Sequence, residues 1–372
     1  MDCSACKNKA DAETAVILED CIMQKGMPAA YGSKISENFI SPVNATVVTK
    51  LLKNDIEIAG RTAVNEFGII NLSGRGDEAE TEAIKGILND GAGFCLCNDI
   101  FGIYRLRAAE NGLCYIHPTY GTVSRLGLMP VVSSMDQIGV LCRDLTSGFM
   151  ILSLIAGVDE GDGAMFPEKN YDYTATGKKP KLGLPMSLID KADEKTRESV
   201  SDFAAGFDTV KIELEYLDIC SRVMYILSCA EISNNISRYD GMKFGRRASG
   251  CRDTNEIYVK TRSECFAPDT KLTCITGCLV LSRDNYVPYY EKAMKLRRLI
   301  KESLRFDKYD LIVLPCEISE NPYENLSLYS LANLAGLPSV SFSYKGRGIM
   351  LIANVKCENR LSAAWEARKH EI

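Results

Sequence analysis

The chain has 372 residues, of which 46% are hydrophobic, and this is enough apolar material for one large α/β domain or two smaller ones. Its formal net charge of −5 and isoelectric point of about 5.4 argue against direct nucleic-acid binding, which requires a basic excess or stripe. No run of 18 apolar residues occurs, and the polar N-terminal stretch lacks the apolar centre of a secretory signal. We therefore expect a cytoplasmic protein that neither spans nor contacts a membrane.

The first half of the chain alternates short apolar runs with helical periodicity. Glycine residues punctuate several of these segments, as expected where a strand or helix ends. In chain order, the pattern predicts a buried strand over residues 15–22, a helix over 45–54, a strand over 56–60, a helix over 81–88, a short strand over 94–96, a strand or turn over 137–141 and a helix over 145–157.

The second half begins with a polar stretch, residues 159–180, which we interpret as a surface excursion. Helices are predicted over 194–206, 216–239 and 286–306, followed by a buried strand over 311–314 that Pro315 ends. The helix over 286–306 has a basic face that we interpret as solvated, formed by Lys292, Lys295, Arg297, Arg298 and Lys301. The alternation of strands and helices predicts an α/β fold with a largely buried sheet.

Fifteen cysteines are present, and most lie within apolar or periodic segments, as is typical of small buried side chains in a reducing compartment. Cys3 and Cys6 form a C-x-x-C pair, but no second pair follows to complete four zinc ligands. The only histidines are His117 and His370. We therefore expect no metal and no cofactor, with residues 1–14 as a disordered or frayed N-terminus and residues 15–372 as one domain.

Seven segments, taken together and in order, resemble the amidase signature family, with the A subunits of tRNA-dependent amidotransferases as its most similar branch. The resemblance covers nearly the whole chain and implies a single domain with a mixed β-sheet flanked by helices on both faces. The segments are residues 32–45 (GSKISENFISPVNA), 60–67 (GRTAVNEF), 118–126 (PTYGTVSRL), 133–139 (SSMDQIG), 237–245 (SRYDGMKFG), 261–266 (TRSECF) and 333–338 (NLAGLP).

The resemblance implies an amidase mechanism in which a serine attacks the amide, a second serine on a cis peptide relays the proton and a lysine is the base. In this chain the lysine position holds Glu19, within VILEDC. Counting back from the Pro-Thr-Tyr-Gly segment places Ile103 at the nucleophile, and ungapped counting places Ala79 at the relay serine. The expected catalytic residues are therefore none, because nucleophile, relay and base are all replaced.

The family's Thr-Gly-Gly segment, whose amides form the oxyanion hole, becomes Ile100-Phe101-Gly102 here. A bulky Phe101 stands where the substrate approaches in the family. We predict that the Ile103 side chain is buried where the substrate carbonyl would lie. A packed pocket would support a scaffold role, and an open cavity lined by Arg262 would support ligand binding.

Three residues remain candidates for ligand binding. Arg262 matches the family arginine that contacts the α-carboxylate of glutamine, and Asp99 and Arg105 match the family pattern around the nucleophile. The carboxylate that would pair with the substrate amine falls near Leu326 and is absent. The alternatives are that Arg262 pairs with an internal acid, and that Asp99 and Arg105 only shape the loop.

A cysteine nucleophile with His117 as its base is a further alternative, since Cys95, Cys97 and Cys114 lie near position 103 in the sequence. Both ends of the chain also read as shorter than in the family. A shortened chain exposes surface that either becomes polar or gains a partner.

These residues lead to three hypotheses. The first is a non-catalytic pseudo-amidase that works as a binding or scaffold subunit in translation, with amidotransferase subunits, an amidase paralogue or a second copy of the chain as partner. The second is an amino-acid or amide binding protein that uses Arg262. The third is an active amidase or glutaminase with a non-standard site.

Overall fold

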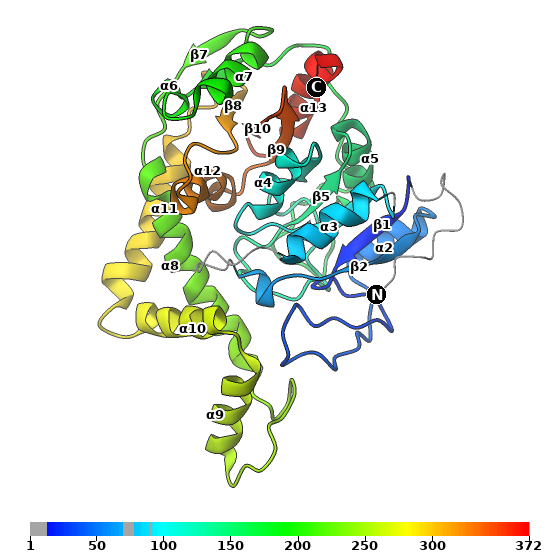
Figure 1. The fold of residues 1–372 in the computed structure, drawn as a ribbon, viewed down its shortest axis with the longest axis vertical. Helices are drawn as coiled ribbons and strands as arrows, with labels where there is room; N and C mark the ends of the chain where they lie inside the picture. Colours follow the sequence, from blue (N-terminus) through cyan, green and yellow to red (C-terminus); the bar gives the residue numbers. More distant parts are fainter. Residues whose placement is uncertain (1–12, 70–77, 90, 372) are drawn as a thin grey trace.

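The computed structural model describes residues 13–69, 78–89 and 91–371, and within them the strands form one ten-stranded mixed sheet. The strand order is β2-β1-β3-β5-β4-β9-β10-β8-β6-β7 (Figure 1). The strands are β1 (Val16–Glu19), β2 (Ile58–Thr62), β3 (Phe94–Asn98), β4 (Cys114–His117), β5 (Ile138–Cys142), β6 (Leu182–Leu184), β7 (Thr209–Lys211), β8 (Leu311–Pro315), β9 (Ser339–Tyr344) and β10 (Arg347–Ala353).

The two ends of this sheet are parallel and its centre is antiparallel. At one end β1 pairs in parallel with β2 and β3, and at the other β6 pairs in parallel with β7 and β8. The central pairs, from β3 with β5 to β10 with β8, are antiparallel. Each parallel end therefore presents the carboxyl ends of three neighbouring strands along one edge.

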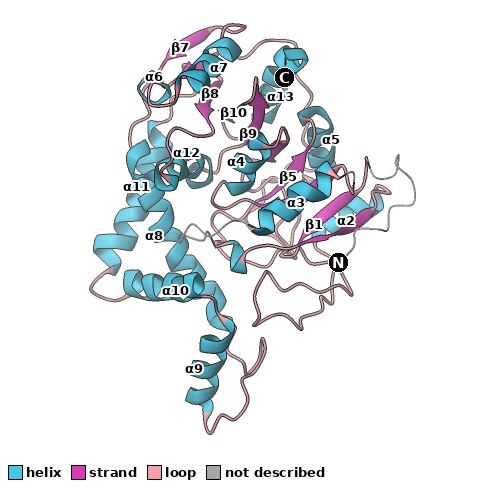
Figure 2. Ribbon diagram, in the orientation of Figure 1, coloured by secondary structure: helices cyan, strands magenta, loops and turns pink. Residues whose placement is uncertain are grey.

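Helices flank the sheet and continue into a helical region beside it, where α9 projects away from the strands (Figures 1 and 2). The α-helices are α2 (Thr46–Lys53), α3 (Glu78–Leu88), α4 (Ile103–Glu110), α5 (Leu145–Ile155), α6 (Met186–Ile189), α7 (Glu194–Ala204), α8 (Leu217–Asn235), α9 (Thr254–Cys265), α10 (Pro268–Leu281), α11 (Lys292–Ser303), α12 (Pro322–Ala335) and α13 (Glu358–Arg368).

Both faces of the sheet are buried, and β3 shows why its sequence is apolar without interruption. Phe94 and Leu96 belong to one core cluster, together with residues of α2 and α5. Cys95 and Cys97 point to the opposite face and belong to a second cluster with residues of α3 and α4. A strand covered by helices on both sides has no polar face, so its sequence does not alternate between apolar and polar residues.

Most predicted elements are confirmed within a few residues, including the mixed sheet with helices on both faces. The residues over 159–180 form no helix or strand, as predicted, but they are not purely superficial, because Tyr173 is buried with its ring centroid 5.9 Å from that of Phe149. The helix over 286–306 begins as a π-helical turn over Tyr286–Glu291 before α11.

The interpretation of the basic face of α11 as solvated is wrong for Arg297. Its guanidinium donates to the Leu334 carbonyl at 2.7 Å and to the Ser134 hydroxyl at 2.8 Å. Burial lowers the pKa of this arginine. Arg297 therefore joins α11 to the end of α12, while the neighbouring Arg298 is exposed.

Candidate active-site region

The segment that carries Ile103 is a tight turn between β3 and α4. Gly102 has φ of +85°, a left-handed conformation that favours glycine. A Cβ atom added there would lie 2.2 Å from the Tyr329 side chain of α12. Backbone conformation and close packing therefore both require glycine, and they fix the start of α4.

Asp99 and Arg105 form a buried ion pair across this turn, with 2.8 Å between Arg105 Nε and Asp99 Oδ2. The amide groups of Tyr104 and Arg105 also donate to the Asp99 carboxylate, each at 3.2 Å. The remaining guanidinium nitrogens donate to the Tyr329 carbonyl at 3.2 Å and to Asn333 Oδ1 at 2.6 Å. Both charged groups are thus engaged by protein atoms and join the turn to α12.

Glu19 lies at the end of β1 and is fully buried. Its Oε2 atom accepts from the Asn98 amide at 2.7 Å and from the Cys21 thiol at 3.0 Å, and its Oε1 atom accepts from the Tyr104 hydroxyl at 2.9 Å. Burial raises the pKa of this carboxyl to about 7, although the three donors act in the opposite direction. Glu19 therefore links β1 to β3 and α4.

Asn98 extends this network to Asp136. The Asn98 side chain donates to Asp136 Oδ1 at 3.0 Å, and the Asp136 carboxylate also accepts from the amides of Val131 and Val132 at 3.1 and 3.2 Å. Burial raises the pKa of Asp136 as well. The interior beside the turn is therefore a connected polar network that protein atoms satisfy.

Phe101 and Leu326 line the same small cavity, which has a volume of about 20 Å³. One water molecule needs roughly 10–15 Å³, whereas small-molecule sites usually measure roughly 300–1,000 Å³. The sequence resemblance predicts Phe101 at a family glycine and Leu326 near the family's amine-binding carboxylate. Two apolar side chains therefore line a space that has no room for an amino acid.

The prediction that the Ile103 side chain is buried is wrong, because it is partly exposed. The reason is its place as the first residue of α4. The amides of Tyr104 and Arg105 are held by Asp99, and both of these side chains turn into the interior. Ile103 is left at the boundary of the core.

The structure keeps Cys97 and His117 apart. Cys97 pairs with Gly139 on β5, and the next position of the β4 register places His117 on the far side of Gly139, roughly 10 Å away at two strand spacings. The Tyr115 hydroxyl fills the space over Gly139 and donates to the Cys97 carbonyl at 3.1 Å. Burial raises the Cys97 pKa well above its ordinary value and lowers the His117 pKa well below its own, so a thiolate–imidazolium pair is disfavoured.

Arg262 lies on α9 and is partly buried. Its guanidinium lies 4.9 Å from the Phe266 ring centroid and donates to the Cys274 sulfur at 3.7 Å. Among the residues that the structure describes, no carboxylate forms an ion pair with it. Arg262 thus remains available to a carboxylate ligand.

Two further predictions concern parts of the chain that are described incompletely or not at all. Ala79 lies in the first turn of α3, but the segment 70–77 before it is outside the described residues. The Cys3 and Cys6 pair is outside them as well. Within residues 13–69, 78–89 and 91–371, no group of three or more His, Cys, Asp or Glu side chains is placed to hold a metal ion.

Several residues of this region escape sequence analysis. Tyr104, Asn98 and Cys21 hold Glu19, and Tyr329 closes the turn at Gly102. Cys21 lies only two residues from Glu19, so the sequence alone could have indicated that the two side chains are close. Tyr104 and Tyr329 come from distant segments and have no local signal.

This geometry can be set beside known proteins. The family model named Amidase matches residues 15–72 and 89–342, and the chain therefore belongs to the amidase family. It is 34% identical to the A subunit of the glutamyl-tRNA(Gln) amidotransferase of Neisseria meningitidis, over 94% of this chain and 82% of that protein. It is 32% identical to the corresponding protein of Thermoanaerobacter pseudethanolicus, over 88% of this chain and 75% of that protein.

Solved structures support the fold. The crystal structure of the glutamyl-tRNA(Gln) amidotransferase A subunit from Thermotoga maritima matches with a TM-score of 0.70 at 22% identity, covering 95% of this chain and 82% of that one. A chain from an inhibitor-bound vestigial complex, described with the origins of an s-triazine catabolic enzyme, matches with a TM-score of 0.79 at 18% identity, covering 96% of this chain and 83% of that one. The protein is therefore a single amidase-signature domain built on a mixed sheet.

Proposed function

We propose that this chain is a catalytically degenerate amidase, a non-catalytic binding or scaffold protein that resembles the A subunits of the tRNA-dependent amidotransferases. The proposal rests on the sequence resemblance, which places Glu19, Ala79 and Ile103 at the three family catalytic positions. Isoleucine has no nucleophilic atom, and alanine cannot relay a proton. Removing a nucleophilic triad leaves only the modest catalysis that binding and polarisation supply.

The surroundings of these positions support the proposal. Three protein donors hold the Glu19 carboxyl, and its hydrogen bonds connect structural elements rather than an open site. Phe101 and Leu326 line a cavity of only about 20 Å³. Both features favour a non-catalytic role, in which the folded domain serves as a scaffold.

A partner is supported by an apolar stripe on α10 that we call the α10 apolar face. Leu272, Ile275 and Leu279 lie on this face at helical spacing and are 48%, 67% and 58% exposed. The opposite side of α10 packs against α8, where Gly277 allows close approach to the Cys229 carbonyl. A helix that is apolar on both sides is expected to be covered on both.

The partner that the relatives suggest is another component of a glutamyl-tRNA(Gln) amidotransferase, because the relatives are named as the A subunits of that enzyme. This would give the protein a role linked to translation in the cytoplasm. No helix among the described residues is long and apolar enough to cross a membrane.

Two alternatives each have one observation in their favour. A pKa of about 7 suits Glu19 for general-base catalysis, which favours an active amidase of non-standard design. Arg262 has no ion-paired acid among the described residues, which favours binding of a carboxylate such as that of an amino acid. We rank the active amidase below the scaffold role because no nucleophile stands at the family position. We rank amino-acid binding below it because the cavity beside Phe101 and Leu326, about 20 Å³, has no room for an amino acid.

The proposal is tested by mixing the purified chain with amidotransferase subunits or with an amidase paralogue, and by studying the chain alone for self-association. Light scattering measures the mass of any complex that forms. We expect a complex with the amidotransferase subunits that Ile275→Lys and Leu279→Lys weaken. The matched control is Val43→Lys, at a residue that is 51% exposed outside this face. The scaffold proposal fails if no partner, including a second copy, forms a stable complex.

A further inference from the structure

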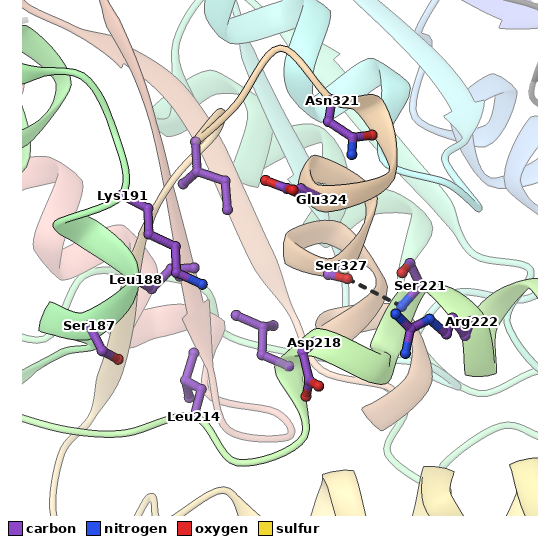
Figure 3. Close-up of a pocket in the computed structure, with 12 residues that line it drawn as sticks. Ser187, Leu188, Lys191, Leu214, Asp218, Ser221, Arg222, Asn321, Glu324 and Ser327 are labelled. Atoms are coloured by element: carbon purple, nitrogen blue, oxygen red, sulfur yellow. Dashed lines mark hydrogen bonds between the residues drawn. The ribbon is translucent and has the colours of Figure 1, made fainter.

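The second parallel end of the sheet holds an open cleft of about 740 Å³ (Figure 3). Each of the parallel strands β8, β6 and β7 contributes its following segment to the wall. Ser187 and Lys191 follow β6, Leu214 follows β7, and Ile318 follows β8. Ligands of α/β proteins commonly bind outside the carboxyl ends of parallel strands.

The cleft has an apolar floor. Leu188 and Leu217 are 7% and 9% exposed, and Leu214 and Ile318 are partly buried beside them. Four aliphatic side chains therefore line one depression. This arrangement suits a ligand with an apolar body.

Four charged side chains stand around this floor. Lys191 and Arg222 approach from opposite sides in Figure 3, with Glu324 on α12 and Asp218 on α8 between them. In the described parts of the chain, none of the four side chains has an ion pair or a hydrogen bond, so their charges remain available. Two positive and two negative groups around one apolar floor match a molecule that carries both charges.

The back wall of the cleft is fixed by a contact between α8 and α12. The Ser221 amide donates to the Ser327 hydroxyl at 3.4 Å, and both residues are largely buried (Figure 3). The charged residues Arg222 and Glu324 are therefore carried by two helices that are held against each other. A preorganised wall lowers the entropic cost of binding.

From this arrangement we infer that the cleft binds a zwitterion with an apolar body, of the class of apolar amino acids and short apolar peptides. Arg222 and Lys191 take the carboxylate, and Glu324 and Asp218 take the ammonium group. Arginine suits the carboxylate because its guanidinium makes two parallel hydrogen bonds. The exposed position of all four charged residues makes each ion pair weak, so we expect binding at millimolar to high micromolar concentration.

This site differs from the region around Ile103. On α12, Leu326 faces the small cavity beside Phe101, whereas Glu324 and Ser327 face the cleft. The inference therefore does not depend on whether the chain has lost catalysis. A ligand bound here lies on the other side of α8 and α12.

The test is calorimetric titration of the full chain at low ionic strength with leucine and with leucyl-leucine, whose comparison separates amino acid from peptide. N-acetyl-leucine amide, which has no charge, is the blocked probe. We expect a zwitterion to bind, Arg222→Gln and Glu324→Gln to weaken its binding by about two- to fivefold each, and the blocked probe to bind more weakly. The matched controls, Arg283→Gln and Asp284→Asn, change exposed charges outside the cleft and should leave binding unchanged.

Two outcomes would overturn the inference. One is the absence of heat with either zwitterion up to about 10 mM, which corresponds to a binding free energy weaker than about −3 kcal/mol. The other is binding that Arg262→Gln abolishes while Arg222→Gln and Glu324→Gln leave it intact, since that result would place the ligand beside α9. A circular dichroism spectrum of each variant checks that the fold is retained.

Discussion

Charged residues are buried and paired at one parallel end of the sheet and exposed at the other. Beside β1 and β3, Asp99 and Arg105 are buried and paired, and Glu19 is held by three donors. Beside β6, β7 and β8, Lys191, Arg222, Asp218 and Glu324 are exposed around a cleft of about 740 Å³. The first end uses its polar groups for internal structure, while the second leaves them accessible to a ligand.

The largest expected effect comes from breaking the buried ion pair. Arg105→Met leaves the Asp99 carboxylate buried without its partner, and removes hydrogen bonds to Tyr329 and Asn333. We expect a loss of about 3–5 kcal/mol in the free energy of unfolding, measured by urea denaturation. Arg222→Met at the open end should change it by less than about 0.5 kcal/mol.

The pair of substitutions Asp99→Asn and Arg105→Met sharpens this test, because removing the second charge should recover part of the loss. Equal effects of Arg105→Met and Arg222→Met would contradict the contrast between the two ends.

The next largest effect on stability is expected at Phe101, which lines the small cavity beside Leu326. Phe101→Ala removes a ring that is only 8% exposed, and we expect a loss of about 3 kcal/mol in the free energy of unfolding. Phe244→Ala, at a ring that is 56% exposed, is the matched control and should cost far less. A neutral Phe101→Ala would mean that this ring does not fill the site.

Glu19 gives a pH-dependent effect of similar or slightly smaller size. The pKa of this carboxyl rises from 4.5 in the unfolded chain to about 7 in the fold, so its protonated form stabilises the fold. This contribution to the free energy of unfolding is fully present below pH 4.5 and is lost as the pH rises through 7. The neutral Glu19→Gln side chain does not share this loss. Between pH 5 and pH 8, the stability of Glu19→Gln relative to the original chain should therefore rise by about 2–3 kcal/mol.

Urea denaturation of both proteins across this pH range measures the difference directly. Parallel stability profiles would show that Glu19 does not titrate inside the fold, and its buried network would then need another explanation.

The smallest expected effect on stability is at the α10 apolar face. Ile275→Lys replaces a side chain that is 67% exposed, so we expect a change below about 0.5 kcal/mol in the isolated chain. Its effect should be seen only in complex formation. A large loss of stability in the isolated chain would show that this face is covered within the protein itself.

The sequence predicts the fold well because the signals for it are local or shared with a family. Seven ordered segments indicate the amidase domain, and apolar runs locate strands such as β1 and β8. Helix α4 was not predicted, since it starts after a left-handed glycine without a capping side chain. Helix α12 was not predicted either, because apolar residues surround it and hide its period.

The sequence predicts which residues stand at the candidate site, but not which of their side chains lie in contact. The sequence shows which residues stand at 19, 99, 103 and 105, yet the contact of Glu19 with Tyr104 joins residues 85 positions apart. Phe101 and Leu326, which line one cavity, are even further apart in the chain. The burial of Ile103 was predicted wrongly because it depends on how α4 is rotated, which the Asp99 contacts decide.

The most direct test of the central claim is release of ammonia from glutamine and asparagine by the purified chain, alone and with amidotransferase subunits. The account predicts no release above that of heat-denatured protein, and no change in Glu19→Gln or Cys97→Ala. Ammonia release that either substitution abolishes, in a variant that keeps its fold, would contradict the account and make the protein an active amidase.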